Sequence, residues 1–450
     1  MIKPYLNKCA IAIGVLLSVN QGFAQQSFSL KEAIDYGVKN HLSIKNAQID
    51  IGSAEARIQE IKAIGLPQIS GNVGWTDNLN IARFFVPAKT FNPNAAEGEV
   101  SAVKFGVQYS ANGTVSLNQL LFDGSYLLGL KASQVYRELA QKNLKASKIT
   151  VVENITKAYY AVLVNEERLK LLDINMGRLD SLLKDTKALN QQGFVEKLDV
   201  DRLTVQVNNL KTERENVLRF QEVAYYLLKF QMGHKLDDTI VLADKLMAID
   251  LNDVSVLDVQ QPFNYSNRIE YSTLQTNSKL AELDIKNNQA GYYPRLVMTG
   301  STGWSTGTDK FNIFSNPWFN ASSIGLSLQI PIFDSFSKKY KIVQAKNRFD
   351  QTKIGMGLLE QSIDLQLRSA QIQVKNYWMT LQEQKRNMEL AQEVVRVTKI
   401  KYKEGVGTNL EIVNAEASLK EAQTNYFQTL YNALIAKVDL DKAAGRLYNE

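Results

Sequence analysis

The stretch GLPQISGNVGW at residues 65–75 has a counterpart in YYPRLVMTGSTGW at residues 292–304. In each stretch a proline ends a helical pattern, a run with many small residues follows, and the run closes on Gly-Trp. A second pair matches in the same way, because VSLNQLLFD at residues 115–123 corresponds to LSLQIPIFD at residues 326–334. These matches indicate that the chain consists of two copies of one repeated unit.

Each copy also contains a long helical pattern with a heptad period. Apolar residues recur at this spacing from Ile155 to Leu183 and again from Leu367 to Tyr402. Each pattern breaks at a glycine and then resumes, as in LNQQGFVEKLDV at residues 189–200 and KYKEGVGTNLEIVNA at residues 401–415. Sustained heptads predict long helices that pack along their length at small crossing angles.

The repeat and the two breaks define the predicted organisation of the chain. The predicted parts are a signal peptide (1–24), a first repeat (25–232), a joining segment (233–261) and a second repeat (262–450). The first repeat is predicted to contain helix 28–65, strands 68–80 and 103–122, long helix 124–192 and return helix 195–232. The second is predicted to contain helix 262–292, strands 295–308 and 320–333, long helix 335–404 and return helix 409–447.

The first residues have the pattern of a secretory signal. Lys3 and Lys8 accompany an apolar run at residues 9–19, and small residues around Ala24 suit cleavage there. The alternative interpretation is a retained membrane helix, but the apolar run is too short to span a bilayer. Cys9 is the only cysteine, so no disulfide and no thiolate chemistry is expected after cleavage.

The charge of the chain argues against a nucleic-acid partner. The sequence has 52 Lys and Arg against 46 Asp and Glu, a net charge of +6. Proteins that bind nucleic acid carry a dense basic patch, whereas these charges are dispersed along the chain.

The expected strands have one apolar face and one small or polar face. Apolar and polar residues alternate at residues 114–121 and again at residues 323–332. A half-buried soluble sheet has this pattern, and so does an outer-membrane barrel that is apolar towards lipid and polar towards its lumen. Four strands are too few for a barrel, whose smallest forms have about eight. Three chains would supply twelve strands, and four chains are not excluded by this count.

At this point the chain resembles the TolC-like outer-membrane efflux protein family. The duplicated layout, the Phe-Asp pairs at 122–123 and 333–334, and the two turn segments carry the resemblance, which extends over residues 27–447. It implies a homotrimer in the outer membrane, with a twelve-stranded β-barrel continuous with a long periplasmic α-helical barrel. Residues 233–261 and the chain ends would contribute to an equatorial belt.

The resemblance also implies a function. The chain would be the exit duct of a tripartite efflux pump or a type I secretion system, and it would pass small molecules or proteins across the periplasm and the outer membrane. Its partners would be a periplasmic adaptor, an inner-membrane pump and outer-membrane lipid. The cargo and the class of pump stay open, as does the choice between an open and a closed state.

By the same resemblance the two turns are the periplasmic tips that contact the adaptor. The candidate contacts are Gly193, Phe194, Val195, Gly405, Val406, Gly407 and Thr408. A glycine that takes a positive φ commonly ends a long helix, as Gly193 and Gly405 are expected to do. A plain helix–turn–helix connector is the alternative interpretation of both segments.

Residues beside the turns are candidates for a gate at the tunnel mouth. They are Asp199, Arg202, Tyr402, Glu411 and Asn414. The family pattern has two successive acids on the returning helix, and Glu411 occupies the first place whereas Asn414 departs from it at the second. Three Glu411 side chains at a narrow mouth would repel one another and attract cations, which predicts a mildly cation-selective, acid-sensitive entrance. The alternative is a solvated acid at a helix start, which the helix dipole favours.

No enzyme motif in the sequence has its necessary context. GWSTG at residues 303–307 matches G-x-S-x-G, but that motif needs a later histidine, and His41 and His234 both come earlier. Two isolated histidines also make a zinc site unexpected. We therefore expect no catalytic, metal or cofactor site. The rival from another class is a periplasmic coiled-coil adaptor or structural tether without a pore.

Overall fold

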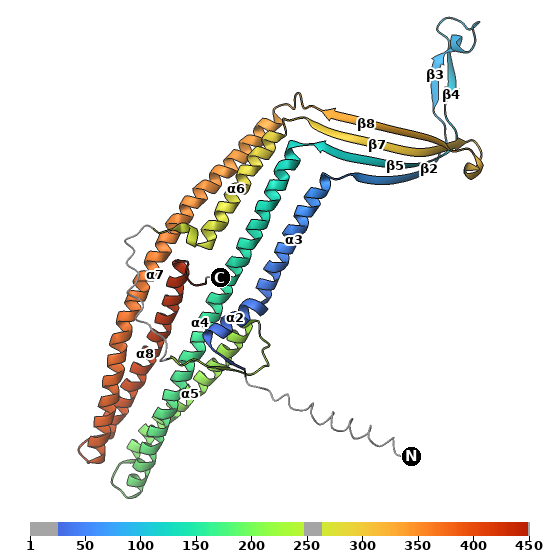
Figure 1. Cartoon of the computed structure of the whole chain (residues 1–450). Helices are drawn as coiled ribbons and strands as arrows, with labels where there is room; N and C mark the ends of the chain where they lie inside the picture. Colours follow the sequence, from blue (N-terminus) through green and yellow to red (C-terminus); the bar gives the residue numbers. More distant parts are fainter. Residues whose placement is uncertain (1–25, 247–262, 449–450) are drawn as a thin grey trace, which may run out of the picture. The chain divides into compact units, whose positions relative to one another are not determined.

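The computed structural model describes residues 26–246 and 263–448 of the chain. The expected signal peptide and most of the joining segment, residues 247–261, lie outside the described residues. Figure 1 shows the course of the chain from one end to the other. The chain divides into two compact units. Residues 51–140 and 275–355 form one of them, and the described residues within 1–50, 141–274 and 356–450 form the other.

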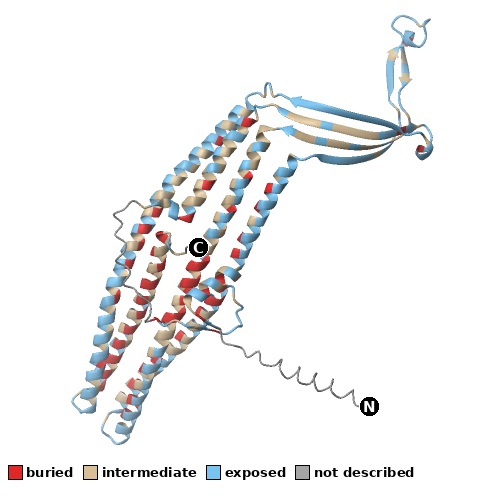
Figure 2. Cartoon of the chain, in the orientation of Figure 1, coloured by how far each residue is buried: buried red, intermediate tan, exposed pale blue. Residues whose placement is uncertain are grey.

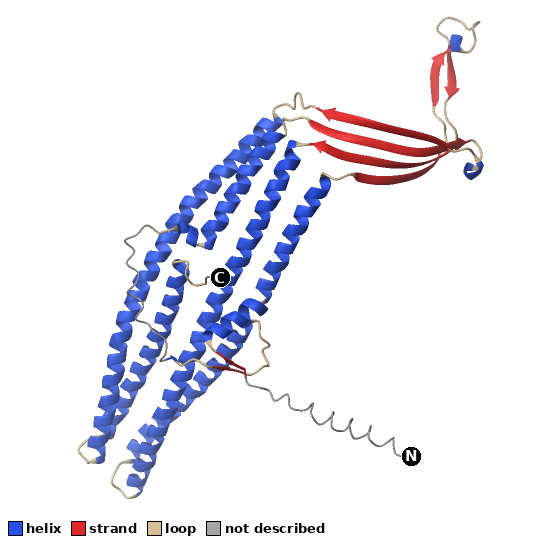
Figure 3. Cartoon of the chain, in the orientation of Figure 1, coloured by secondary structure: helices blue, strands red, loops and turns tan. Residues whose placement is uncertain are grey.

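The first of these units contains a four-stranded antiparallel sheet (Figure 3). Its strands follow the order β2-β5-β7-β8, with β2 at Gln68–Asp77, β5 at Tyr109–Phe122, β7 at Arg295–Thr308 and β8 at Phe319–Gln329. Strands from both copies of the repeat therefore pair with one another at the centre, through β5 and β7. Within the chain, β2 and β8 are the two edges of this sheet.

The register places the apolar side chains of all four strands on one face of the sheet. Ile69 pairs with Leu117, Leu117 with Gly300, and Gly300 with Ile324. Paired residues point to the same side, and alternate residues along a strand do too. The apolar face therefore contains Ile69, Val73, Val115, Leu117, Trp304, Ile324 and Leu326. The opposite face contains a row of four serines, Ser70, Ser116, Ser301 and Ser323.

The structure corrects the predicted strand over 103–122. A separate hairpin is present, formed by β3 at Arg83–Pro87 and β4 at Val100–Lys104, with the short helix η1 at Ala88–Thr90. The chain changes its pairing partner between Lys104 and Tyr109, so one predicted strand becomes two. The sequence pattern did not separate them because both halves alternate in the same way.

The predicted strand over 320–333 is also too long. β8 ends at Gln329, ahead of Pro331, because proline has no N–H to donate to a neighbouring strand. Helix α7 then begins at Ser337, after Ser335 and Phe336 adopt positive φ values of 54° and 67°. The connection between strand and helix is therefore an irregular turn rather than a direct continuation.

The predicted helix over 28–65 is two helices, α2 at Leu30–Asn40 and α3 at Leu42–Ile64. His41 between them has extended backbone angles. The end of helix α5 packs against this break, since a Cβ on Gly233 would lie 3.0 Å from the Cα of His41. The interruption thus coincides with a close contact to the end of α5.

The remaining elements of the described chain are mainly long helices. α4 spans Gly124–Gln191, α5 Lys197–Met232, α6 Ile269–Ala290, α7 Ser337–Lys403 and α8 Asn409–Ala443. The short helix η4 at Tyr265–Asn267 precedes α6, and η5 at Ile313–Ser315 lies between β7 and β8. A small parallel sheet pairs β1 at Gln26–Phe28 with β6 at Ile240–Leu242, which the sequence patterns did not predict.

Buried residues recur along α4, α5 and α8 (Figure 2), where they follow the heptad seams. One core cluster contains Ile155, Tyr159, Val162, Leu228 and Leu434 among others. The Tyr159 hydroxyl lies 2.9 Å from the Phe28 carbonyl and 2.9 Å from Asp244. Asp244 also accepts a hydrogen bond from the Leu30 amide, so the small sheet is attached to both α2 and α4. No helix in the described ranges has both the length and the apolar content to cross a bilayer.

Candidate functional site

The two helix-ending turns have the same hydrogen-bond pattern. In the first turn Phe194 N donates to Leu189 O at 2.9 Å and Gly193 N to Asn190 O at 3.0 Å. In the second, Val406 N donates to Lys401 O at 3.0 Å and Gly405 N to Tyr402 O at 3.1 Å. These bonds form a Schellman motif, which needs a left-handed residue after the helix.

Gly193 and Gly405 supply that left-handed residue, with φ values of 79° and 76°. A side chain at either position would strain the backbone, so the residue type and the turn geometry agree. Beyond each glycine an apolar side chain points outwards, because Phe194 is 74% exposed and Val406 is 73% exposed. The candidate tip residues therefore present apolar surface to solvent at both turns.

The two turns lie beside each other in the same unit (Figure 1). Asn409, the first residue of α8, donates a hydrogen bond through Nδ2 to the Asp199 carbonyl at 3.2 Å. The start of α8 is therefore attached to the start of α5. The structure thus brings together residues of both copies of the repeat.

Each of the two acidic gate candidates lies close to a basic side chain. Arg202 Nη1 lies 3.7 Å from Asp199 Oδ1, and Lys401 Nζ lies 3.6 Å from Glu411 Oε2. Glu411 also lies in the first turn of α8, where its amide donates to the Thr408 hydroxyl that caps the helix. Thr408 therefore has a structural role as a helix cap.

Tyr402 and Asn414 occupy different environments. Tyr402 packs against a cluster of apolar side chains that includes Leu183, Leu203 and Ile412. Its hydroxyl is buried and has no hydrogen-bond partner within the described part of the chain. Asn414 is exposed.

Sequence patterns did not identify a buried polar cluster between α4 and α8. Arg178 donates from Nε and Nη2 to both carboxylate oxygens of Glu416, at 2.8 and 2.7 Å. Asn175 donates to Gln423 at 2.6 Å and accepts from Arg178 at 3.0 Å. We call these four residues the polar clamp. The sequence contains one signal of this cluster. Glu416 and Gln423 are one heptad apart, and they lie one helical turn after the seam residues Ile412 and Leu419.

Ion pairs continue the attachment of α8 along its length. Glu213 on α5 contacts Arg168 on α4 at 2.9 Å and Lys420 on α8 at 2.5 Å. Burial alone would raise the pKa of Glu213, but the hydrogen bonds from Lys420 and Arg168 outweigh it and hold the pKa below its usual value. Helix α8 is thus attached by charged contacts to α4 and α5, the helices of the other repeat.

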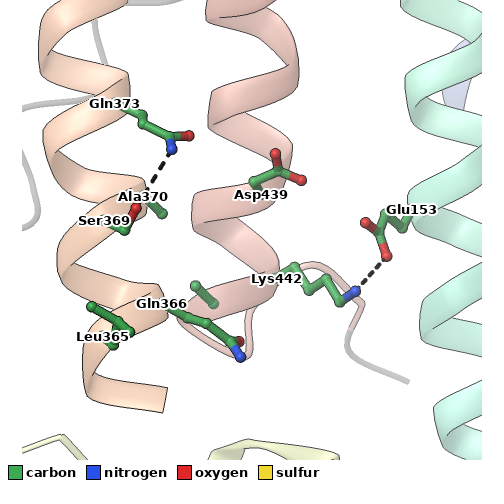
Figure 4. A pocket seen from close by; sticks show the side chains of 9 residues that line it. Glu153, Leu365, Gln366, Ser369, Ala370, Gln373, Asp439 and Lys442 are labelled. Atoms are coloured by element: carbon green, nitrogen blue, oxygen red, sulfur yellow. Dashed lines mark hydrogen bonds and ion pairs between the residues drawn. The ribbon is translucent and has the colours of Figure 1, made fainter. Parts of the chain in front are cut away.

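A cavity of about 490 Å³ lies where α4, α7 and α8 meet (Figure 4). Glu153 and Lys442 reach towards each other across one side of it, 2.7 Å apart. Gln373 donates to Ser369 at 3.5 Å on the α7 side. The charges are paired, since Lys157 contacts both Glu153 at 2.8 Å and Asp439 at 2.6 Å. No group of three or more potential metal ligands occurs among the described residues.

Comparison with known proteins assigns the family. The model of the family described as "Outer membrane efflux protein" matches residues 34–226 and 269–446. The chain is 22% identical over 425 residues to "Probable efflux pump outer membrane protein TtgC" of Pseudomonas putida, covering 93% of this chain and 83% of that protein. It is 20% identical over 336 residues to "Alkaline protease secretion protein AprF" of Pseudomonas aeruginosa, covering 74% of this chain and 69% of that protein.

A solved structure has the same fold. The outer membrane protein VceC of Vibrio cholerae superposes with a TM-score of 0.70 at 15% identity, over 92% of this chain and 96% of that one. The chain therefore belongs to the outer membrane efflux protein family, whose members are transport proteins of the outer membrane. This confirms the family resemblance drawn from the duplicated layout and the turn segments.

Proposed function

We propose that the chain is one subunit of a homotrimeric exit duct that serves a tripartite efflux pump or a type I secretion system. The sheets of three copies form a twelve-stranded barrel in the outer membrane, and the long helices form a periplasmic tunnel. The relatives named for an efflux pump and for protease secretion support these two kinds of system.

The sheet is the observation that carries the proposal. β2 and β8 are both edges, and they run in opposite directions because the four strands alternate. β8 of one copy can therefore pair antiparallel with β2 of the next, and three copies give twelve strands, an even number in the usual range for such barrels. Closure also removes the unpaired edges, which otherwise favour aggregation.

The two faces of the sheet suit a barrel wall. The apolar face with Ile69, Leu117 and Ile324 would contact lipid, and the face with the row of four serines would line the lumen. A soluble sheet would cover its apolar face with other elements. Instead Ile69, Trp304, Ile324 and Leu326 are exposed in the single chain.

Two helices have exposed apolar stripes that a second copy can cover. On α5 the stripe contains Phe220, Val223, Leu227 and Phe230, and on α7 it contains Leu365, Ile372 and Met379. The α5 residues follow i, i+3, i+7 and i+10, and the α7 residues recur at heptad spacing, so each set lies along one side of its helix. Contact between such stripes of neighbouring subunits would extend the heptad packing around the tunnel.

The tips and the charged residues beside them would form the lower end of this tunnel. The exposed apolar residues Phe194 and Val406 suit contact with helical hairpins of a periplasmic adaptor, which in turn engages an inner-membrane pump. Asp199, Arg202, Tyr402, Glu411 and Asn414 would surround the mouth, with Glu411 supplying a ring of three carboxylates.

The test is the native mass of the mature protein after extraction from outer-membrane fractions, followed by conductance in planar bilayers. We expect a trimer that requires detergent and forms discrete conducting channels. A monomer or dimer released without detergent would contradict the duct and favour a periplasmic coiled-coil adaptor or tether. A trimer that never conducts would contradict the pore.

A further inference from the structure

The β3–β4 hairpin has one face that the rest of the described chain leaves bare. Residues 83, 85 and 87 of β3 pair with residues 104, 102 and 100 of β4, in that order. Directly opposite residues point to the same side of a hairpin, and so do alternate residues along each strand. We call this surface the hairpin face, and it consists of Arg83, Phe85, Pro87, Val100, Ala102 and Lys104. All six residues are exposed, Phe85 to 75% and Val100 to 62%.

The opposite face of the hairpin is better covered. Val86, Ser101 and Val103 are half-buried there. The rings of Phe84 and Phe105 meet edge to face, with centroids 6.0 Å apart. Neither strand belongs to a larger sheet or makes extensive contact with another element of the described chain. An isolated two-stranded hairpin is marginally stable in water at best, so a partner from outside the chain would stabilise the bare face.

The two basic side chains of the hairpin face indicate the charge of that partner. Arg83 and Lys104 are directly opposite each other, and like charges in this position repel. Neither side chain forms an ion pair or a hydrogen bond with another described residue. Two unpaired cations therefore lie beside the exposed apolar side chains of Phe85 and Val100. Such a surface complements an anionic amphiphile, because aromatic and basic side chains together favour the boundary between lipid headgroups and acyl chains.

The connectivity of the chain determines the end of the four-stranded sheet to which the hairpin is attached. Helix α3 leads into β2 at Gln68, and β5 leads into α4 after Phe122. The hairpin is inserted at the other ends of these two strands, between Asp77 and Tyr109. In the proposed duct the helices are periplasmic, so the hairpin belongs to the outer surface of the membrane. Gly106 in its connection has a φ of 137°, which favours glycine and lets the chain turn there.

We propose that the hairpin face binds the lipid of the outer-membrane surface, with Arg83 and Lys104 on lipid phosphate groups and with Phe85 and Val100 at the boundary of the acyl chains. The inference rests on the proposed channel function, because that function puts the hairpin at the outer surface. The hairpin gives each subunit an attachment to lipid that is separate from the apolar face of its sheet. Because the contact with phosphate is electrostatic, it weakens as the salt concentration increases.

A spin label on the hairpin face measures its contact with lipid. The only native cysteine, Cys9, is in the expected signal peptide, so Ala102→Cys supplies the only thiol of the mature protein. The labelled mature protein is reconstituted into vesicles of equimolar phosphatidylglycerol and phosphatidylcholine. We expect oxygen, which concentrates among acyl chains, to reach the label, and a water-soluble nickel complex not to reach it. Ser101→Cys, labelled on the opposite face, is the matched control and should stay accessible to the nickel complex.

Neutralisation of the two bases tests the contact with phosphate. We expect Arg83→Gln and Lys104→Gln each to lower the ratio of lipid-bound to solvent-exposed label about fivefold, since one basic residue near an anionic surface contributes about this factor. High salt, or vesicles of phosphatidylcholine alone, should lower the ratio too, whereas Arg83→Lys should keep the native ratio. Lys89→Gln, which removes a charge from η1 outside the hairpin face, is the control and should leave the ratio unchanged.

Three results would overturn the proposal. A label at position 102 that the nickel complex reaches in all vesicles would mean that the hairpin face is open to water or to a protein partner, and that Arg83 and Lys104 only protect the hairpin from edge-to-edge aggregation. A label shielded from both reagents, in detergent as well as in vesicles, would mean that another copy of the chain covers the face. A ratio that neither salt nor the two glutamine variants change would contradict the contact with phosphate.

Failure of the proposed function is a separate outcome. A protein that neither inserts into the vesicles nor conducts ions contradicts the duct itself. A protein that inserts and conducts while its label at position 102 stays exposed to water leaves the duct intact and contradicts only the lipid contact of the hairpin face.

Discussion

At the level of single residues, the clearest requirement is the left-handed backbone of Gly405. Its φ of 76° brings any Cβ close to the following carbonyl oxygen, although the space around it is open. We expect Gly405→Ala to lower the free energy of unfolding by about 1–2 kcal/mol. The measurement is denaturant unfolding of the mature protein followed by circular dichroism.

Gly177 provides a matched control for this substitution. It lies in the interior of α4, no atom of the described residues lies within 4 Å of an added Cβ, and its φ is not positive. Gly177→Ala should therefore stabilise the protein by roughly 0.5–1 kcal/mol through helix propensity. Equal effects of the two substitutions would show that the Gly405 turn is not under this backbone constraint.

Glu411 is the residue expected to set ion preference at the mouth. In the proposed trimer, three Glu411 carboxylates near the axis would favour cations, each with a Lys401 ammonium 3.6 Å away. Glu411→Gln should therefore shift the reversal potential in a salt gradient towards lower cation preference. Glu60→Gln, an exposed acid on α3 that pairs with Arg57, is the control and should change nothing. An unaltered reversal potential in Glu411→Gln would show that Glu411 does not line the mouth.

At the level of elements, the attachment of α8 to α4 and α5 depends on carboxylates. Burial alone would raise the pKa of Glu213 and that of Glu153. Hydrogen bonds from their basic partners outweigh the effect of burial and hold both pKa values below the ordinary value of 4.5. A group whose pKa is lower in the folded state stabilises the fold above its unfolded pKa. This stabilisation is lost as the pH falls below 4.5 through the folded pKa.

Glu213→Gln should accordingly reduce both the stability at neutral pH and its loss on acidification. The measurement is the thermal midpoint from pH 7 down to pH 3, with Glu60→Gln as the exposed control. The native protein and Glu60→Gln should share one profile, while Glu213→Gln should have a lower and flatter one. A profile for Glu213→Gln parallel to that of the native protein would mean that this ion pair has no part in the acid response.

At the level of the whole molecule, trimer closure requires β2 of one copy to pair with β8 of another. Asn72 on β2 and Ala321, Ser323 and Gly325 on β8 share the serine-lined face. We expect Asn72→Cys, combined with cysteine at one of these three β8 positions, to give disulfide-linked trimers on denaturing gels. Ser116→Cys on the central strand β5 is the control partner for Asn72→Cys, and it should give no linked chains. Linked dimers without any trimer would contradict closure by three copies.

Much of the fold could be predicted because its signals are local. Heptad spacing from Ile155 to Leu183 predicts a long helix, and Gly193 and Gly405 predict where two helices end. The break at His41 was not predicted, and the structure shows that Gly233, far away in the sequence, packs against it. The β3–β4 hairpin was also missed, since the alternation of residues continues while the pairing partner changes.

The candidate gate shows the same division between local and distant information. The sequence by itself determined the duplicated unit, the two turns and the acid at Glu411, because periodicity and turn chemistry depend on neighbouring residues. Only the tertiary structure decided that Arg178 pairs with Glu416, 238 positions away, and that the Tyr402 hydroxyl is buried without a partner among the described residues. Such contacts depend on how whole helices align with one another, and no local pattern contains that alignment.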